Sequence, residues 1–178
     1  NQGNLQFQDV TAEAGVGTQH WATGVSMVDI NQDSWLDIYV CVASKFDSTQ
    51  SYNYFFINQG LDENGVPTFV DQAKAFGLDD AGYSTQAAFF DYDLDGDLDM
   101  YLLTNGIENF NQNQLRPKKE HGEAVTNDRL YRNDTPASQT SAPPICTFTN
   151  VTQEAGILTE GYGLGVGITD FNQDGYPD

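Results

Sequence analysis

Three nine-residue segments of the chain place oxygen-bearing side chains at the same four positions. Each segment has Asp at positions 1, 5 and 9, and Asp or Asn at position 3. Ca²⁺ prefers six to eight oxygen ligands in flexible geometry, and carboxylates packed this closely repel one another unless a cation lies between them. We therefore predict a calcium site in each segment, with ligands from Asp29, Asn31, Asp33 and Asp37, from Asp91, Asp93, Asp95, Asp97 and Asp99, and from Asp170, Asn172, Asp174 and Asp178.

The three loops differ at position 6, where a sharp turn around an ion favours glycine. The second loop has Gly96 and the most aspartates, so we expect it to bind calcium most tightly. The first loop has Ser34 there, and a non-glycine residue in a left-handed conformation costs about 1–2 kcal/mol. We predict that the first loop is the weaker of these two sites.

The loops have two alternative interpretations. An EF-hand needs a Glu at position 12 and flanking helices. Here position 12 is Val40 in the first loop and Leu102 in the second, and the flanking residues are typical of strands, which argues against an EF-hand. A solvated acidic turn without an ion is the other alternative, and three copies of the same spacing make it the weaker explanation.

The elements that would position these loops also repeat. A nine-residue motif that begins with Phe and ends with Gly, the Phe-to-Gly motif, precedes each loop at residues 7–15, 69–77 and 148–156. A short apolar motif recurs at 54–58 and 129–133. Four short strands per repeat are typical of a β-propeller blade. We expect strands at about 24–28, 37–42, 54–58 and 68–71, and again at about 86–90, 100–104, 129–132 and 147–151.

The predicted fold class is therefore all-β, with blades of four antiparallel strands. Residues 1–15 would hold the last strand of a preceding blade, at 5–10, and residues 16–76 a complete blade. Residues 77–155 would form a second blade with an insert at 106–126, and residues 156–178 the start of a third. A β-sandwich with coincidental acidic loops and a short open solenoid remain as alternatives.

Composition limits the partners. The chain of 178 residues has 26 acidic and 7 basic side chains, a formal net charge of −19. Nucleic acids and anionic membrane surfaces need basic patches, so neither is expected as a partner, and no apolar stretch is long enough to span a membrane. Two cysteines make no disulfide framework: Cys41 lies in an apolar run, and a bridge to Cys146 stays open.

These motifs resemble a known family. The residues Tyr162-Gly163 followed by the third loop look like the FG-GAP repeat of integrin α-subunits and the related VCBS repeats. The order of motifs, with Gly82–Asp91 and Gly161–Val166, is similar to bacterial VCBS proteins of the ASPIC/UnbV-associated type. The resemblance implies a seven-bladed propeller, calcium in the blade loops and an extracellular, outer-membrane or cell-surface location.

The expected function is binding rather than catalysis. We expect a calcium-stabilised binding or scaffold module that contacts a protein or glycan, because no hydrolase or metalloprotease motif occurs. The insert carries cations that could contact this partner, although a tolerated surface insertion is an alternative. A polysaccharide-degrading propeller enzyme and a structural subunit of a surface assembly are the other candidate functions. The candidate partner-binding residues are Arg116, Lys118 and Lys119.

Overall fold

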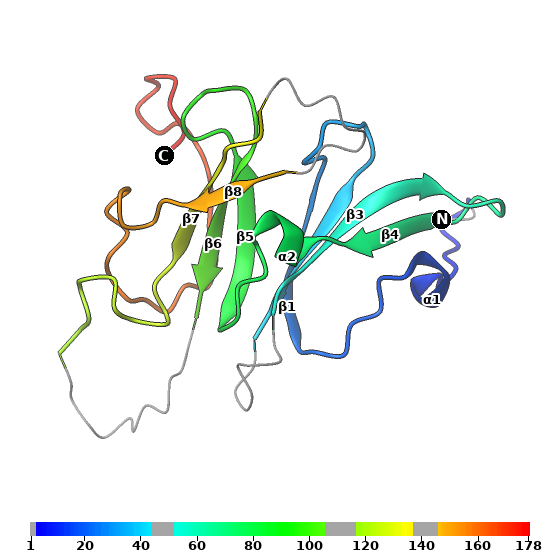
Figure 1. Ribbon diagram of the computed structural model, residues 1–178, viewed down its shortest axis with the longest axis horizontal. Helices are drawn as coiled ribbons and strands as arrows, with labels where there is room; N and C mark the ends of the chain where they lie inside the picture. Colours follow the sequence, from blue (N-terminus) through cyan, green and yellow to red (C-terminus); the bar gives the residue numbers. More distant parts are fainter. Residues whose placement is uncertain (1–2, 44–51, 106–116, 137–145) are drawn as a thin grey trace.

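Two four-stranded antiparallel sheets make up the computed structural model, which describes residues 3–43, 52–105, 117–136 and 146–178 (Figure 1). In each sheet the strands are ordered as they follow one another in the chain. Sheet I contains β1 (Ala22–Val28), β2 (Asp37–Val42), β3 (Tyr54–Leu61) and β4 (Pro67–Asp71). Sheet II contains β5 (Ser84–Phe90), β6 (Asp99–Thr104), β7 (Arg129–Asn133) and β8 (Phe148–Asn150).

The predicted strands agree with these bounds to within a few residues, because both sheets repeat one apolar pattern. The second strand of each sheet is almost wholly buried, as its run of Val, Ile, Leu and Tyr requires. The first hairpins share one register, in which Val28 pairs with Asp37 and Phe90 pairs with Asp99. Each acidic loop therefore spans the turn between the first two strands of its sheet.

Two one-turn helices interrupt the pattern, α1 (Thr11–Ala14) and α2 (Ala73–Phe76). They lie inside the first two copies of the Phe-to-Gly motif, where no helix is predicted from the sequence. Each ends at a glycine in the left-handed conformation, Gly15 with φ +75° and Gly77 with φ +73°. Glycine adopts this conformation without the steric cost of a side chain, which explains the position of both residues.

Two predicted strands are not formed. Residues 5–10 are not in a strand and belong to neither of the two described sheets. The first strand of the third repeat is also missing: in this stretch Tyr162 forms an isolated bridge with Asn105, and Gly163 N donates to Thr104 O. An extended segment gains its stability from pairing with neighbours, and these segments lack a full partner within the described residues.

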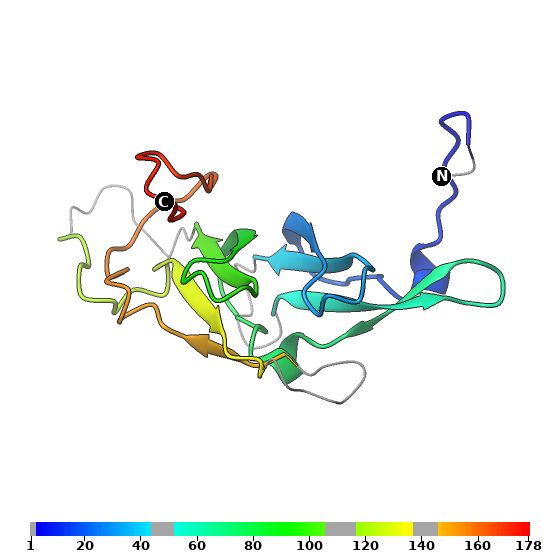
Figure 2. The same cartoon turned by 90° about the horizontal axis from the view of Figure 1, so that it is seen from above.

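The sheets pack directly on each other (Figure 2). Strand β1 lies against β5, where Thr23 Oγ1 donates to Ser84 O and Ser26 Oγ to Ala87 O, each at 2.6 Å. Phe89 of sheet II packs against the rings of Tyr39 and Phe55, with centroids 5.8 Å apart in both pairs. One apolar cluster thus spans both sheets and fixes their relative position.

Both cysteines belong to this core. Cys41 and Cys146 are each 1% exposed and are free thiols. Burial raises the pKa of the Cys41 thiol to about 12 and that of Cys146 to about 11, so both stay protonated at neutral pH. Cys41 therefore acts as a small apolar core residue, as its sequence context predicted.

Among the described residues, no helix has the length and apolar character needed to cross a membrane.

Candidate metal centre

The three acidic loops lie at the same end of the molecule, along the upper edge in Figure 1. In each loop the first aspartate accepts hydrogen bonds from the backbone N–H groups of positions 5 and 6. Asp91 binds Asp95 N at 3.1 Å and Gly96 N at 3.0 Å. The corresponding distances are 3.0 and 2.9 Å for Asp29, and 3.1 and 2.8 Å for Asp170. The repeated sequence thus folds into one repeated loop conformation.

The last aspartate of each loop closes the turn. Asp37, Asp99 and Asp178 accept the N–H of position 2 at 3.1, 2.9 and 2.8 Å. In the two sheets this residue is fully buried, with 0% exposure of Asp37 and of Asp99. Each of these two carboxylates therefore holds the loop ends together from inside the fold.

Two asparagines, Asn58 and Asn133, anchor the loops to the third strand. Each backbone N–H donates to the second oxygen of the buried aspartate at 2.8 Å. Each side-chain amide donates to the carbonyl at loop position 8, Leu36 or Leu98. Neither asparagine is among the ligands predicted from the sequence, although both recur at the end of the short apolar motif, which is a usable signal.

The backbone is left-handed at positions 4 and 6 of every loop. Position 4 has φ between 56° and 62° in all three loops, and position 6 has φ 73° at Ser34, 99° at Gly96 and 91° at Gly175. The left-handed conformation considered for position 6 is confirmed. Ser34 therefore carries the steric cost that glycine avoids in the other two loops.

Exchanging the residues at position 6 should shift stability in opposite directions. Ser34→Gly should raise the free energy of unfolding by about 1 kcal/mol, because it removes the left-handed strain, and Gly96→Ser should lower it by a similar amount. Urea denaturation of both variants in EDTA measures the effect without a metal contribution. Equal signs for the two variants would contradict the assigned strain.

Three carboxylates of the second loop converge. One ligand oxygen from each of Asp91, Asp93 and Asp99 lies within 4.8 Å of the others. Asp95 Oδ1 instead accepts Asp97 N at 3.1 Å, and Asp97 Oδ1 is a buried oxygen with no hydrogen-bond donor among the described residues. An anionic cluster of hard oxygens with an unmatched acceptor beside it has the chemistry that a hard cation requires.

The first and third loops share a different arrangement. The amide of Asn31 donates to Asp33 Oδ2, and the amide of Asn172 donates to Asp174 Oδ2, both at 2.9 Å. In both loops the asparagine oxygen accepts the backbone N–H of position 5. The neutral asparagine at position 3 thus reduces the repulsion among the carboxylates of the first and third loops, whereas Asp93 adds a further negative charge to the second loop.

Burial and mutual repulsion shift the acidity of the loops. Burial is the main cause that raises the pKa of Asp37 and of Asp99 to about 6. The pKa of Asp97 also rises to about 6, first through burial and then through the neighbouring aspartates Asp95, Asp99, Asp93 and Asp91. These carboxylates are costly to ionise without a nearby positive charge, and a bound cation would lower their pKa values.

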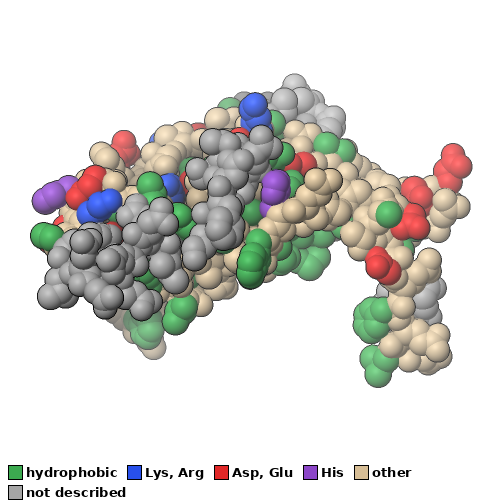
Figure 3. Space-filling model, turned by 90° about the horizontal axis from the view of Figure 1, so that it is seen from below, with side chains coloured by type: hydrophobic (Ala, Val, Ile, Leu, Met, Phe, Trp, Pro, Cys, Tyr) green, Lys and Arg blue, Asp and Glu red, His purple; other side chains and the backbone are tan. Residues whose placement is uncertain are grey.

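Two of the three candidate partner-binding cations, Lys118 and Lys119, belong to the described residues and are not part of an acidic loop. Lys118 is exposed, and Lys119 is half-buried, with its backbone N–H donating to Glu160 Oε1 at 2.9 Å. Arg116 and the rest of residues 106–116 are outside the described residues. Figure 3 shows the end of the molecule opposite the loops, where Lys and Arg side chains lie beside Asp and Glu rather than forming one basic patch.

Comparison with known proteins gives one partial match. No protein-family model matches the chain. Mouse cartilage acidic protein 1 is 37% identical over 101 residues, which cover 56% of this chain and 14% of that protein. The chain is thus similar to a small part of a longer protein, and the activity of that whole protein is not transferred by this match.

Proposed function

We propose that the chain is a calcium-stabilised binding or scaffold module built from β-propeller blades. The observation that carries the proposal is the convergence of Asp91, Asp93 and Asp99 in a loop whose conformation is repeated twice elsewhere. The ion would hold the turn between the first two strands of each sheet. Calcium is proposed because the ligand set is all oxygen, which Ca²⁺ prefers.

The packing between the sheets supports the propeller. Met27, Phe89 and Ile168 occupy equivalent positions two residues before each acidic loop. Phe89 packs on Tyr39 and Phe55 of sheet I. Tyr101 and Leu130 are the equivalents of Tyr39 and Phe55 in sheet II, and they line a cleft of about 500 Å³ together with Ile168. The residue at this position faces the equivalent residues of the preceding repeat in both cases, which supports stacked blades.

The face of β1 that points away from sheet II carries exposed apolar side chains at the same repeat positions. Met27 is 59% exposed and its neighbour Val25 is 60% exposed, whereas Ala87, the equivalent of Val25 in sheet II, is 3% exposed. We propose that a further blade covers this face, because Val25 and Met27 expose adjacent apolar side chains on one face of β1, whereas the equivalent face of β5 is covered at Ala87. The resemblance to FG-GAP and VCBS repeats implies a propeller of seven blades.

An extracellular, outer-membrane or cell-surface location and a protein or glycan partner complete the proposal. The net charge of −19 is consistent with a calcium-rich medium, where bound ions reduce self-repulsion. The similar mouse protein is named for its acidity and for cartilage, and this chain is also acidic. A binding role is preferred to an enzymatic one because the converging carboxylates are better explained as cation ligands.

Calcium should raise the melting temperature. At a free concentration near 100 times the dissociation constant, the stabilisation is about 2.7 kcal/mol per site, which corresponds to roughly 5–10 °C for a chain of this size. The experiment compares thermal melting in EDTA, in millimolar magnesium and in millimolar calcium. The variant with Asp91→Asn and Asp93→Asn should lose the part of the shift that the second loop contributes. Equal melting of the unmodified protein in calcium and EDTA would refute the calcium sites.

Calcium affinity should fall as the pH drops through 6. Asp37 and Asp99 have pKa values of about 6 in the metal-free fold, so protons compete with the ion below that pH. In the metal-free protein the sign is opposite: the folded pKa exceeds the unfolded value, so these groups favour folding less as the pH rises from about 4 to 6. Calorimetric titration at pH 5.0 and 7.0 should give weaker binding at pH 5.0.

A further inference from the structure

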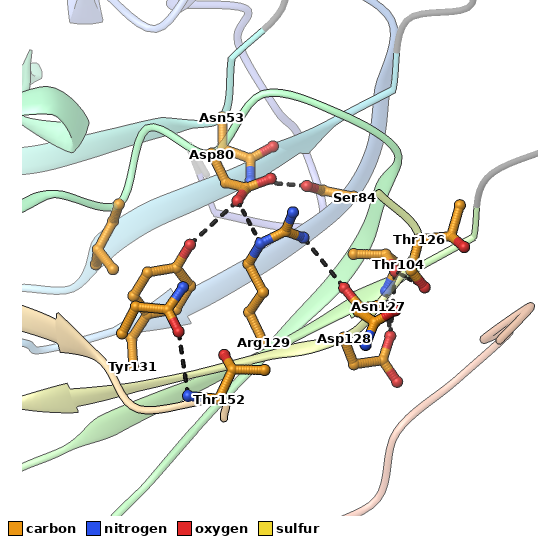
Figure 4. A network of polar contacts seen from close by, with 12 residues as sticks. Asn53, Asp80, Ser84, Thr104, Thr126, Asn127, Asp128, Arg129, Tyr131 and Thr152 are labelled. Atoms are coloured by element: carbon orange, nitrogen blue, oxygen red, sulfur yellow. Dashed lines mark hydrogen bonds and ion pairs between the residues drawn. The ribbon is translucent and has the colours of Figure 1, made fainter. Parts of the chain in front are cut away.

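A polar pocket lies at the end of sheet II opposite the acidic loops. Its volume is about 460 Å³, within the range of small-molecule sites. Gly122 and Ala124, from the described end of the insert, form part of its lining, together with Asn150 at the end of β8 and Gln153 and Glu154 of the turn that follows it. Figure 4 shows the polar network beside it, in which Arg129 lies between Asp80 and Asn127.

The inner part of this network has acceptors without donors. Asn127 is 4% exposed and lines the pocket; its amide donates to Ile157 O at 3.4 Å, but its buried Oδ1 has no donor among the described residues. Behind it, the Asp80 side chain is 10% exposed, and its Oδ1 also has no described donor. A buried acceptor without a donor is unfavourable, so this region can accept a hydrogen bond from a bound group.

Arg129 is held rigidly next to these acceptors. Its Nε lies 3.0 Å from Asp80 Oδ2, and its Nη1 donates to Asn127 O at 3.1 Å. A guanidinium has five donors, and the contacts of Arg129 within the described residues use two of them, so the others can serve a ligand. Arg129 also lines the pocket, so the site offers fixed donors as well as acceptors.

The rim contributes groups of both kinds. Asn150 Oδ1 accepts Thr152 N at 3.1 Å, which leaves its amide N–H groups available. The side chains of Gln153 and Glu154 are exposed and form no hydrogen bond within the described part of the chain. Asp128 also lines the pocket, but its carboxylate already accepts from Thr104 N at 2.7 Å and from Tyr101 Oη at 2.9 Å.

We propose that this pocket binds a neutral, hydroxyl-rich ligand of the size of one sugar unit, the end of a glycan. A hydroxyl group both donates and accepts, which matches a pocket lined by the unpaired acceptor of Asn127 beside the amide of Asn150 and the guanidinium of Arg129. The net charge of −19 disfavours an anionic ligand, and the polar lining disfavours an apolar one. The inference rests on the proposed binding function and assigns its partner class and location.

Saturation-transfer NMR with the methyl glycosides of glucose, galactose, mannose and N-acetylglucosamine, in millimolar calcium, tests the site. At least one sugar should give saturable transfer to the unmodified protein. The variant with Gln153→Ala and Glu154→Ala should bind it about tenfold more weakly, since two exposed hydrogen-bonding groups are lost. Glu13→Ala is the matched control, because Glu13 is exposed and occupies the position of Glu154 in the first copy of the Phe-to-Gly motif. This substitution should leave sugar binding unchanged.

Transfer from none of the four sugars, or equal affinity of the double variant and the control, would overturn the assignment. Calcium melting of the same samples separates this outcome from failure of the proposed function. A calcium shift without sugar binding refutes the pocket alone. Sugar binding that is weakened in the double variant, in a protein whose melting temperature does not change with calcium, supports the pocket and refutes the calcium sites.

Discussion

Replacing Asp99 with alanine should lower the free energy of unfolding by about 3 kcal/mol or more, even in EDTA. The carboxylate is fully buried and accepts Tyr92 N at 2.9 Å and Asn133 N at 2.8 Å. Truncation leaves both N–H groups without an acceptor, and each buried unpaired donor costs about 1–3 kcal/mol. Urea denaturation followed by circular dichroism gives the difference directly.

Asp178→Ala is the matched control, because Asp178 occupies the same position in the third loop. It accepts Phe171 N at 2.8 Å, but it is exposed, so water can replace the lost acceptor. We expect a change within about 0.5 kcal/mol. Equal losses from Asp99→Ala and Asp178→Ala would show that burial of the closing aspartate contributes nothing, contrary to the structure.

Gly24→Ala should destabilise the protein by about 3 kcal/mol through the interface between the sheets. A Cβ atom at residue 24 would lie 2.1 Å from Thr85 O and 3.3 Å from Gln86 Cα, both backbone atoms of β5. A backbone cannot rotate away as a side chain can, so β1 and β5 must separate, and overpacking of this kind costs about 1–3 kcal/mol or more. Thermal and urea denaturation should both report the loss.

Gly17→Ala provides the comparison for a glycine in open surroundings. The nearest atom to its added Cβ would be Thr11 Cγ2, at 4.0 Å, so we expect a change within about 0.5 kcal/mol. If Gly24→Ala were as stable as Gly17→Ala, the close approach of β1 to β5 would not exist in solution.

Much of the fold could be predicted because its determinants are local and repeated. The bounds of β2 followed directly from its apolar run, and the acidic loops were recognisable from the spacing of Asp29, Asp91 and Asp170 and the residues after them. The one-turn helices were missed because four residues give too little periodicity to distinguish a helical turn from a bend.

The remaining features depend on residues distant in the chain. The recurrence of Asn58 and Asn133 marks them as equivalent, but their role depends on hydrogen bonds to aspartates 21 and 34 residues earlier in the chain. The missing strands at 5–10 and in the third repeat have suitable sequences, but strand formation requires a partner that sequence composition does not reveal. The pocket beside Arg129 likewise combines segments from three separate parts of the second repeat.

The strand order of the two sheets has a consequence for how the protein folds. Every strand pairs only with its neighbours in the chain, so each sheet can form from contacts of short sequence separation. Contacts between the sheets, such as Thr23 with Ser84, join residues 61 positions apart. Low contact order favours rapid formation, and loop-closure entropy delays distant contacts. Each sheet should therefore assemble as a kinetic unit, and the docking of β1 onto β5 should complete folding as the slower step.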